Sequence, residues 1–200
     1  MYLFGASGHG KVIAEIAESN AVVIDGFIDS DPSKINLLGY PVFREVPTQN
    51  IEVAISIGNN KIRQKIVTST TNFSYINLIH PRSNISKRAV LGQGTVVMAG
   101  VAINADVQIG EHCIINTNAS VDHDCVIEDF VHISPNVALA GNVVVGEGTH
   151  IGIGASIIQG IKIGKWCTIG AGAVIIKNIQ DGSTVVGNPG RIINKHNDKF

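Results

Sequence analysis

The sequence predicts two folded parts, a small α/β domain followed by a parallel β-helix that takes up the rest of the chain. Two observations carry this prediction: an unbroken six-residue repeat, and a strand, glycine-rich turn and helix pattern at the start of the chain. An apolar fraction of 44% in 200 residues is enough to build a core for both parts. We expect the domains to cover residues 1–79 and 80–200.

The repeat runs from Ile85 to Ile175, where every sixth residue is Ile, Leu or Val. Two residues before each of these positions stands a small or β-branched residue, such as Ala119 or Val131. A period of six with two alternate apolar positions describes a short strand followed by a turn, and not a helix of period 3.6. Hexapeptide repeats of this kind form parallel β-helices.

The three cysteines, Cys113, Cys125 and Cys167, all fall on the small position of the repeat. An odd number without metal-ligand spacing argues against a disulfide framework and against a zinc ribbon. We therefore expect each of them to be a buried, small apolar residue and not a nucleophile.

The N-terminal part begins with an apolar run, Tyr2–Phe4, then a glycine-rich turn over 5–10, then a helix over Lys11–Glu18. This order presents backbone N–H groups and a helix N-terminus to an anion. The spacing G-x-x-G-x-G differs from the dinucleotide fingerprint, and the glycines are equally consistent with a tight turn alone. In a small parallel sheet of Rossmann type, further elements are expected at Val22–Ile28 (strand), Val53–Ile57 (strand) and Asn60 to about Thr68 (helix).

The charge balance excludes several classes of partner. With 15 basic and 16 acidic residues, no broad field favours nucleic acid or an anionic membrane surface. The N-terminus lacks the basic and apolar regions of a signal peptide, and no stretch approaches the length of a membrane span. These features predict a cytoplasmic protein.

Three motifs indicate a family. They are the glycine turn at 5–11 (GASGHGK), the segment 57–60 (IGNN) with Arg63, and the segment 78–81 (LIHP) before the repeats. Together they resemble the sialic acid O-acetyltransferase and UDP-4-amino-sugar N-acetyltransferase family, which includes the bacillosamine-pathway and perosamine N-acetyltransferases. The likeness covers nearly the whole chain.

The resemblance implies a left-handed β-helix of triangular section, a homotrimer, acetyl-CoA as acetyl donor and no metal. It also implies a UDP- or GDP-linked 4-amino sugar as acceptor, in bacterial glycan biosynthesis. The residues that it assigns to this acceptor are Ser7, Gly8, His9, Gly10, Asp29, Ser30, Gly58 and Asn116.

The segment 116–124 matches the family's catalytic segment, which makes His123 the general base and Asp124 the carboxylate that raises its basicity. His123 lies two residues past the aliphatic Val121, so its phase in the repeat puts it at a turn and not in the core. Imidazole, with an unperturbed pKa of ~6.5, is suited to accept a proton at neutral pH.

The 18-residue coil of the family places Gly141 directly above His123, about 4.8 Å along the axis. Family members bind the acetyl carbonyl with the N–H of this glycine, which would stabilise an oxyanion. His132 is half a coil from His123, so the two are expected to meet only between subunits. The resemblance assigns the following residues to acetyl-CoA: His132, Gly141, Ile153, Gly154, Ala171, Gly172 and Lys177.

Three alternatives remain open at this stage. His132 and His150 are 18 apart, as in a γ-class carbonic anhydrase, but that class also needs two histidines five residues apart, which this chain lacks. A non-catalytic β-helix is the second alternative, and O-acetylation of sialic acid is the third. For transfer itself we expect direct attack without an acyl-enzyme, because Ser120 and Cys125 stand respectively at a turn and inside the prism.

Overall fold

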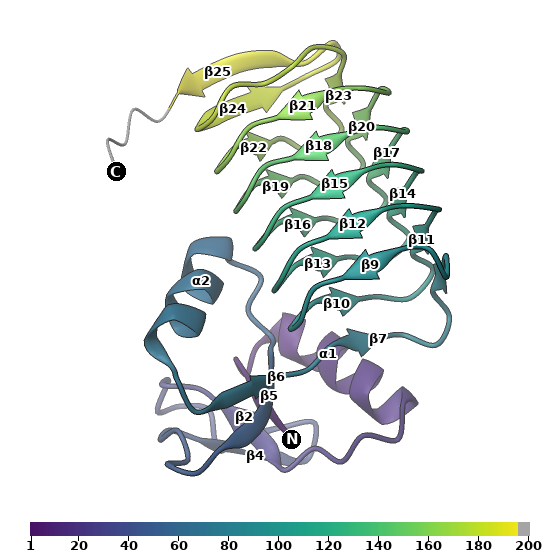
Figure 1. Ribbon diagram of the computed structural model, residues 1–200. Coiled ribbons are helices and arrows are strands. Elements are labelled where there is room, and N and C mark those ends of the chain that lie inside the picture. The colour runs from purple at the N-terminus through teal and green to yellow at the C-terminus, as the bar shows by residue number, and fades with distance from the viewer. Residues whose placement is uncertain (196–200) are drawn as a thin grey trace.

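The computed structural model describes residues 1–195 and confirms the predicted fold class. An α/β domain with a six-stranded sheet sits beneath one end of a left-handed parallel β-helix (Figure 1). The sheet has the strand order β3-β4-β2-β1-β5-β6 and is parallel except for the β3–β4 hairpin. Its elements are β1 (Tyr2–Phe4), α1 (Gly8–Ser19), β2 (Gly26–Ile28), β3 (Asn36–Leu37), β4 (Tyr40–Phe43), β5 (Ile51–Ile55), α2 (Asn60–Ser69) and β6 (Phe73–Tyr75).

Some boundaries differ from the sequence predictions. β2 begins at Gly26 and not at Val22, because Val22 still closes the end of α1 through a hydrogen bond to Ala17 O, and pairing with the first strand starts only at Asp25. β5 lies two residues earlier than predicted. The hairpin and β6 were not predicted, since their strands are only two to four residues long, too short for a period to be recognised.

The β-helix consists of strands that are mostly two residues long, arranged in three parallel sheets. Strand partners lie 18 residues apart, as in the pair Val96↔Ile114, so three hexapeptides make one coil; the last coil is shorter, with Thr168 paired to Thr184. The first sheet contains β7 (Leu78–Ile79), β10 (Val96–Val97), β13 (Ile114–Ile115), β16 (His132–Ile133), β19 (His150–Ile151), β22 (Thr168–Ile169), β24 (Ser183–Val186) and the antiparallel β25 (Arg191–Lys195). The second contains β8 (Asn84–Ile85), β11 (Ala102–Ile103), β14 (Ser120–Val121), β17 (Ala138–Leu139), β20 (Ser156–Ile157) and β23 (Val174–Ile175), and the third β9 (Val90–Leu91), β12 (Gln108–Ile109), β15 (Val126–Ile127), β18 (Val144–Val145) and β21 (Lys162–Ile163).

The repeat positions fill the prism as predicted. The aliphatic column and the small column form one continuous buried cluster. All three cysteines are buried within it, and burial raises the pKa of each thiol. Their Sγ atoms contact backbone carbonyls of the next turn, as in the 3.1 Å contact of Cys113 Sγ with Glu128 O. The interpretation of the cysteines as core residues is confirmed.

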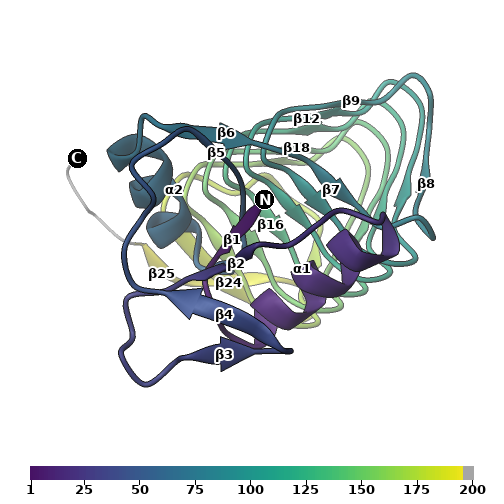
Figure 2. The ribbon, with the colours of Figure 1, turned by 90° about the horizontal axis from the view of Figure 1, so that it is seen from below.

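The α/β domain is joined to the β-helix through both of its helices (Figure 2). The apolar side of α1, with Ile13 and Ile16, packs in one cluster with Leu78, Val96 and Ile114 on the outer face of the first sheet. Because these side chains are buried in one cluster, the contact fixes the position of α1, and of the loop before it, relative to the coils.

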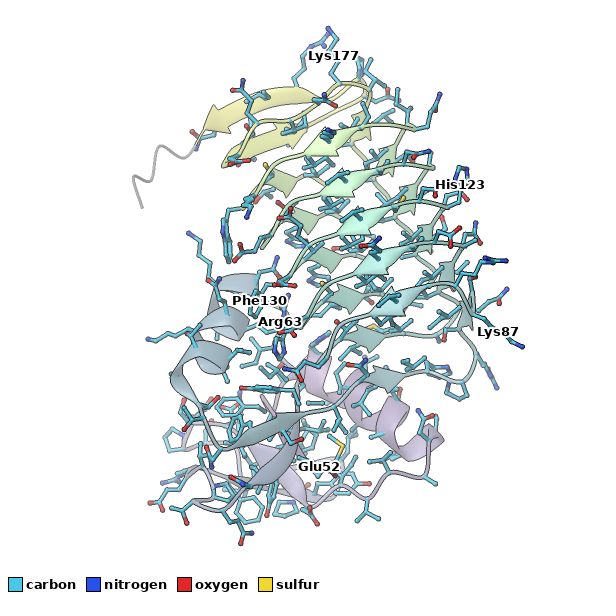
Figure 3. The ribbon with its side chains drawn as sticks, in the orientation of Figure 1. Glu52, Arg63, Lys87, His123, Phe130 and Lys177 are labelled. Atoms are coloured by element: carbon cyan, nitrogen blue, oxygen red, sulfur yellow. The ribbon has the colours of Figure 1, made fainter. Side chains whose placement is uncertain are left out.

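Arg63 of α2 forms the second joint. Its side chain is 1% exposed and donates to the carbonyl oxygens of His112 (2.7 Å), Phe130 (2.8 Å) and Ile57 (3.1 Å), and to Asn60 Oδ1 (2.9 Å). Burial lowers the pKa of the guanidinium to about 10. Since no carboxylate faces it in the described chain, these neutral acceptors alone compensate the buried charge. Figure 3 shows Arg63 and Phe130 at this junction.

Candidate active site

His123 lies in the turn between β14 and β15, at the edge where the second and third sheets meet. Its side chain is exposed, and its Nδ1 lies 2.7 Å from Asp124 Oδ2. Asp124 has a left-handed backbone (φ 58°), as do Asp106, Asn142 and Gly160 at the same edge, and Asp adopts this conformation more readily than most residues. Because Nδ1–H donates to the carboxylate, Nε2 carries the free lone pair and is the basic atom.

Two carboxylates raise the pKa of His123 above its usual value. The larger effect comes from the hydrogen bond to Asp124 and the next from the charge of Asp122, while partial loss of water acts in the opposite direction. The imidazole is therefore a stronger base than a free one, and the imidazolium formed by proton uptake is stabilised where it arises.

Gly141 lies directly against the imidazole ring. A β carbon at this position would come within 2.6 Å of both Cε1 and Nε2 of His123, so the ring occupies the space that a side chain would take. Within residues 1–195 the N–H of Gly141 has no hydrogen-bond acceptor. A free N–H and a basic nitrogen therefore lie side by side on one edge.

Three further residues continue this edge column in steps of 18, namely Lys87 and Ala105 below His123, and Gln159 above Gly141. Figure 3 shows His123 on the edge of the solenoid away from α2, with Lys177 at its C-terminal end. Lys177 is exposed and is three coils from His123, a separation of about 14 Å along the axis at about 4.8 Å per coil.

A second cluster lies on the outer face of the first sheet, against the α/β domain. His132 Nδ1 lies 3.3 Å from Gly58 O, and its Nε2 lies 3.1 Å from Asn116 Nδ2. A carbonyl only accepts, so Nδ1 carries the proton and Nε2 accepts from the amide. Burial, with the nearby His150 and Arg63, lowers the pKa of His132 to about 3. His132 is therefore a neutral residue of fixed tautomer at neutral pH.

Two more histidines adjoin this cluster. His150 stacks on His132 with ring centroids 4.8 Å apart, as their 18-residue spacing predicted, and its Nε2 lies 2.8 Å from Ser134 Oγ. The His9 ring, at the start of α1, lies 6.3 Å from that of His132, and its Nε2 is buried without a partner in the described chain. Burial lowers the pKa of His9 to about 4.

The N-terminal loop residues assigned from the resemblance have different environments. Ser7 precedes α1 in an extended conformation, its side chain makes no capping hydrogen bond, and the space beside Gly8 is open. Asp29 instead accepts from Ala6 N and Lys34 Nζ, both at 2.8 Å, so it braces the loop. Ser30, next to it, is exposed.

Gly10 has a packing reason, because a β carbon there would come within 2.6 Å of Gly5 O. A glycine at this position therefore permits the close approach of helix and loop, whatever the loop binds.

The remaining residues assigned to acetyl-CoA form a strip on the edge between the first and second sheets. Gly154 and Gly172 are 18 apart, have left-handed backbones (φ 67° and 65°), and have open space where a side chain would be. Ile153 and Ala171, which precede them, are exposed, and Gly172 N donates to Ile153 O at 2.8 Å. The strip is smooth, as expected.

The structure thus brings His123, Asp124 and Gly141 together on one edge, and His9, Gly58, Asn116 and His132 on the opposite face. These two groups do not meet within one chain. Sequence reasoning did not find the role of Arg63, because it depends on which segments pack together. It also missed the contact of Asn104 with Asp122, although their spacing of 18 residues places them in one column.

No group of three or more His, Cys, Asp or Glu side chains in residues 1–195 is arranged to hold a metal ion. Nor does any helix in this part of the chain have the length and apolarity needed to cross a membrane.

Comparison with known proteins found two family models that match separate parts of this chain. Residues 1–70 match the family model of the PglD N-terminal domain, and 88–123 and 142–177 match that of the bacterial transferase hexapeptide (six repeats). A curated relative, UDP-N-acetylbacillosamine N-acetyltransferase of Bacillus subtilis (strain 168), is 42% identical over 110 residues, which are 48% of this chain and 50% of the relative. The match thus spans about half the length of that protein.

Two solved structures match along almost the whole chain. The acetyltransferase domain of PglB from Neisseria gonorrhoeae FA1090, in complex with acetyl coenzyme A, is 40% identical with a TM-score of 0.89, covering 96% of this chain and 98% of that one. PerB from Caulobacter crescentus, in complex with CoA and GDP-perosamine, is 38% identical with a TM-score of 0.90, covering 96% of each chain.

Fold and edge geometry together define a hexapeptide-repeat transferase with an α/β domain ahead of its β-helix. The comparisons show which family within this class the chain belongs to. It is a member of the family of PglD-type sugar acetyltransferases, together with the PglB acetyltransferase domain and PerB. The family resemblance stated from the sequence motifs is confirmed.

Proposed function

We propose that the protein transfers the acetyl group of acetyl-CoA to the 4-amino group of a nucleotide-linked amino sugar, with His123 as general base. The observation that carries the proposal is the edge formed by His123, Asp124 and Gly141 in a chain of this family. Relatives with bound acetyl-CoA, and with bound CoA and GDP-perosamine, support both substrates.

The chemistry follows from the two free groups on this edge. The sugar ammonium first releases one proton to water. As the resulting amine attacks the thioester carbon, His123 Nε2 takes a second proton from its nitrogen, which leaves the amide nitrogen neutral. The carbonyl oxygen gains negative charge and accepts a hydrogen bond from Gly141 N–H. When the C–S bond breaks, the imidazolium returns a proton to the leaving CoA sulfur, so His123 ends the cycle neutral.

We assign the acceptor to the segment 1–79 and to the adjoining face of the coils. The N-terminus of α1 has no capping side chain and no acidic residue in its first turn, so its N–H groups are available to a pyrophosphate beside Ser7 and Gly8. His9 Nε2 lacks a polar partner in the described chain, which the bound acceptor would supply. Gly58 O and Asn116 Nδ2 both contact the ring of His132, which adjoins that of His9.

We assign acetyl-CoA to the segment 80–200. In this proposal the pantetheine arm lies along the strip of Ile153, Gly154, Ala171 and Gly172, and Lys177 meets a phosphate. Lys177 lines a hollow together with Arg191 at the C-terminal end of the solenoid, so two cations are near each other there.

A site built between subunits reconciles the two separated groups. We propose a homotrimer in which the His123 edge of one protomer faces the His132 face of its neighbour. The second sheet offers small outward residues for such contact, among them Ala102, Ser120 and Ala138. Size-exclusion chromatography with light scattering measures the oligomeric state directly.

The test of function is release of free thiol from acetyl-CoA with a panel of UDP- and GDP-linked 4-amino sugars and free sialic acid. We expect turnover on one amino sugar, reduced by about 10³-fold or more in His123→Ala. Lys87→Ala, in the same edge column two coils away, is the matched control and should retain wild-type activity. Activity on sialic acid alone would replace N-acetylation by O-acetylation, and silence on every acceptor would contradict the proposal.

Complementation tests the shared site. The first variant, His123→Ala, lacks the base, and the second, His132→Ala, lacks a residue that we expect to contact acetyl-CoA. Each should be inactive alone, and the two are co-expressed so that mixed trimers form. A site that takes its base from one subunit and His132 from another is intact in about a quarter of cases, so about 25% of the activity should return. If both residues acted within one chain, no mixture would recover activity.

A further inference from the structure

We propose that Asn104 and Asp122 form a positioning pair that aligns His123 from the coil below it. The role rests on the proposed function of His123, but the pair can be tested without turnover. Asn104 Nδ2 donates to Asp122 Oδ1 at 2.7 Å, and the backbone N–H of His123 donates to the same oxygen at 2.8 Å. Asp122 Oδ1 therefore links Asn104, in the coil below, to the backbone of His123.

The spacing explains how the pair is built. Asn104 and Asp122 are 18 residues apart and follow β11 and β14, which pair in register. Each is anchored by the coil above it, since Asn104 N donates to Val121 O and Asp122 N donates to Leu139 O, both at 3.0 Å. The two side chains thus start from fixed backbones, and little conformational entropy is lost when they meet.

With this pair in place, both backbone polar groups of His123 are hydrogen-bonded. Its N–H is held by Asp122 and its carbonyl oxygen accepts from Asn142 N at 2.9 Å. Asp124 then needs to orient only the ring, through Nδ1. Asp122 and Asp124 therefore act differently, the first on the backbone and the second on the imidazole.

Asp122 also acts through its charge. Hydrogen bonds from Asn104 and from His123 N lower the pKa of Asp122, so it is ionised throughout the range in which His123 titrates. Its charge is the second cause, after the Asp124 hydrogen bond, of the raised pKa of His123. The imidazolium formed during proton transfer is thus stabilised by two carboxylates.

Asp122→Asn separates charge from geometry, because the amide oxygen still accepts from His123 N. We measure the His123 ring resonances by NMR titration and the pH profile of kcat/KM. The pKa of His123 should fall, and the acidic limb of the profile should move to lower pH by the same amount, with the high-pH plateau within about twofold of wild type. Asp122→Ala removes both effects and should also lower the plateau about 10-fold. Asn104→Ala should lower the high-pH plateau of kcat/KM by a smaller factor than Asp122→Ala.

Ser86→Ala is the matched control, since Ser86 stands one coil below Asn104 in the same column, and within the described chain its side chain accepts only from Arg88 N of its own turn. It should change neither the titration nor the profile. A His123 titration in Asp122→Asn that superimposes on that of wild type would overturn the electrostatic role. An unchanged plateau in Asp122→Ala would overturn the positioning role. If the protein turns over no acetyl acceptor but the titration still shifts, the proposed function fails while the pair stands.

Discussion

Gly141→Ala tests whether the catalytic edge depends on close contact between base and glycine. The added β carbon would lie 2.6 Å from Cε1 and Nε2 of His123, whereas ordinary contact begins at 3.4 Å. The ring must therefore withdraw by about 1 Å. The backbone at Gly141 is not in the left-handed region, and Ala105 occupies the same column one coil below His123, so the fold should tolerate the change.

The expected loss follows from the displacement. The ring is held 2.7 Å from Asp124, and a shift of about 1 Å away from that oxygen would break the bond. A misplacement of this size costs about 10²-fold in rate, which corresponds to about 2.7 kcal/mol of activation free energy. The pKa of His123 should also fall toward its unperturbed value, because the Asp124 bond is the main cause of its elevation.

The assay is thiol release at saturating acetyl-CoA, combined with NMR titration of His123 and a thermal unfolding curve. Ala105→Gly, the opposite change in the same column, is the control and should keep the wild-type rate. We expect Gly141→Ala to unfold near the wild-type temperature while its kcat falls. A variant that turns over within about threefold of wild type, with an unchanged pKa of His123, would refute the argument from contact.

Three further predictions concern other parts of the molecule. Asp124→Asn should lower the pKa of the base and shift the acidic limb of the kcat/KM profile to lower pH, and an unmoved limb would contradict the dyad. Arg63→Met should lower the free energy of unfolding in urea by about 3 kcal/mol or more, because it leaves buried carbonyls without donors, whereas the exposed Lys61→Met should cost less than about 1 kcal/mol. His9 and His132 have folded pKa values of about 4 and about 3, below ~6.5 in the unfolded chain, so the unfolded state binds more protons as the pH falls below 6.5. Stability should therefore decrease by roughly 1–2 kcal/mol per histidine between pH 7 and pH 5, and a melting temperature independent of pH over this range would exclude neutral burial.

Much of the β-helix and of its catalytic edge could be predicted from the sequence. Ladder pairing forces residues 18 apart into one column, so simple addition placed Gly141 over His123 and His150 over His132. The phase of the repeat also separated the inward cysteines from the outward histidines. These inferences needed only local periodicity and the identity of the turn residues.

The α/β domain was predicted less completely. Its first strand, two helices and sheet type were recognised, but the β3–β4 hairpin and β6 were not, and two other strands were misplaced by a few residues. Short edge strands gain most of their stability from neighbours that are distant in sequence, so local pattern carries little information about them.

The sequence by itself determined the repeat, the coil length, the columns and the position of the base at a turn, because each of these follows from a period enforced by hydrogen bonding between neighbouring coils. Only the tertiary structure showed that Arg63 fastens the α/β domain to the coils and that His132 is held neutral in one tautomer. The physical reason is that burial, pKa and side-chain contacts depend on the packing of separate segments, which no local period encodes.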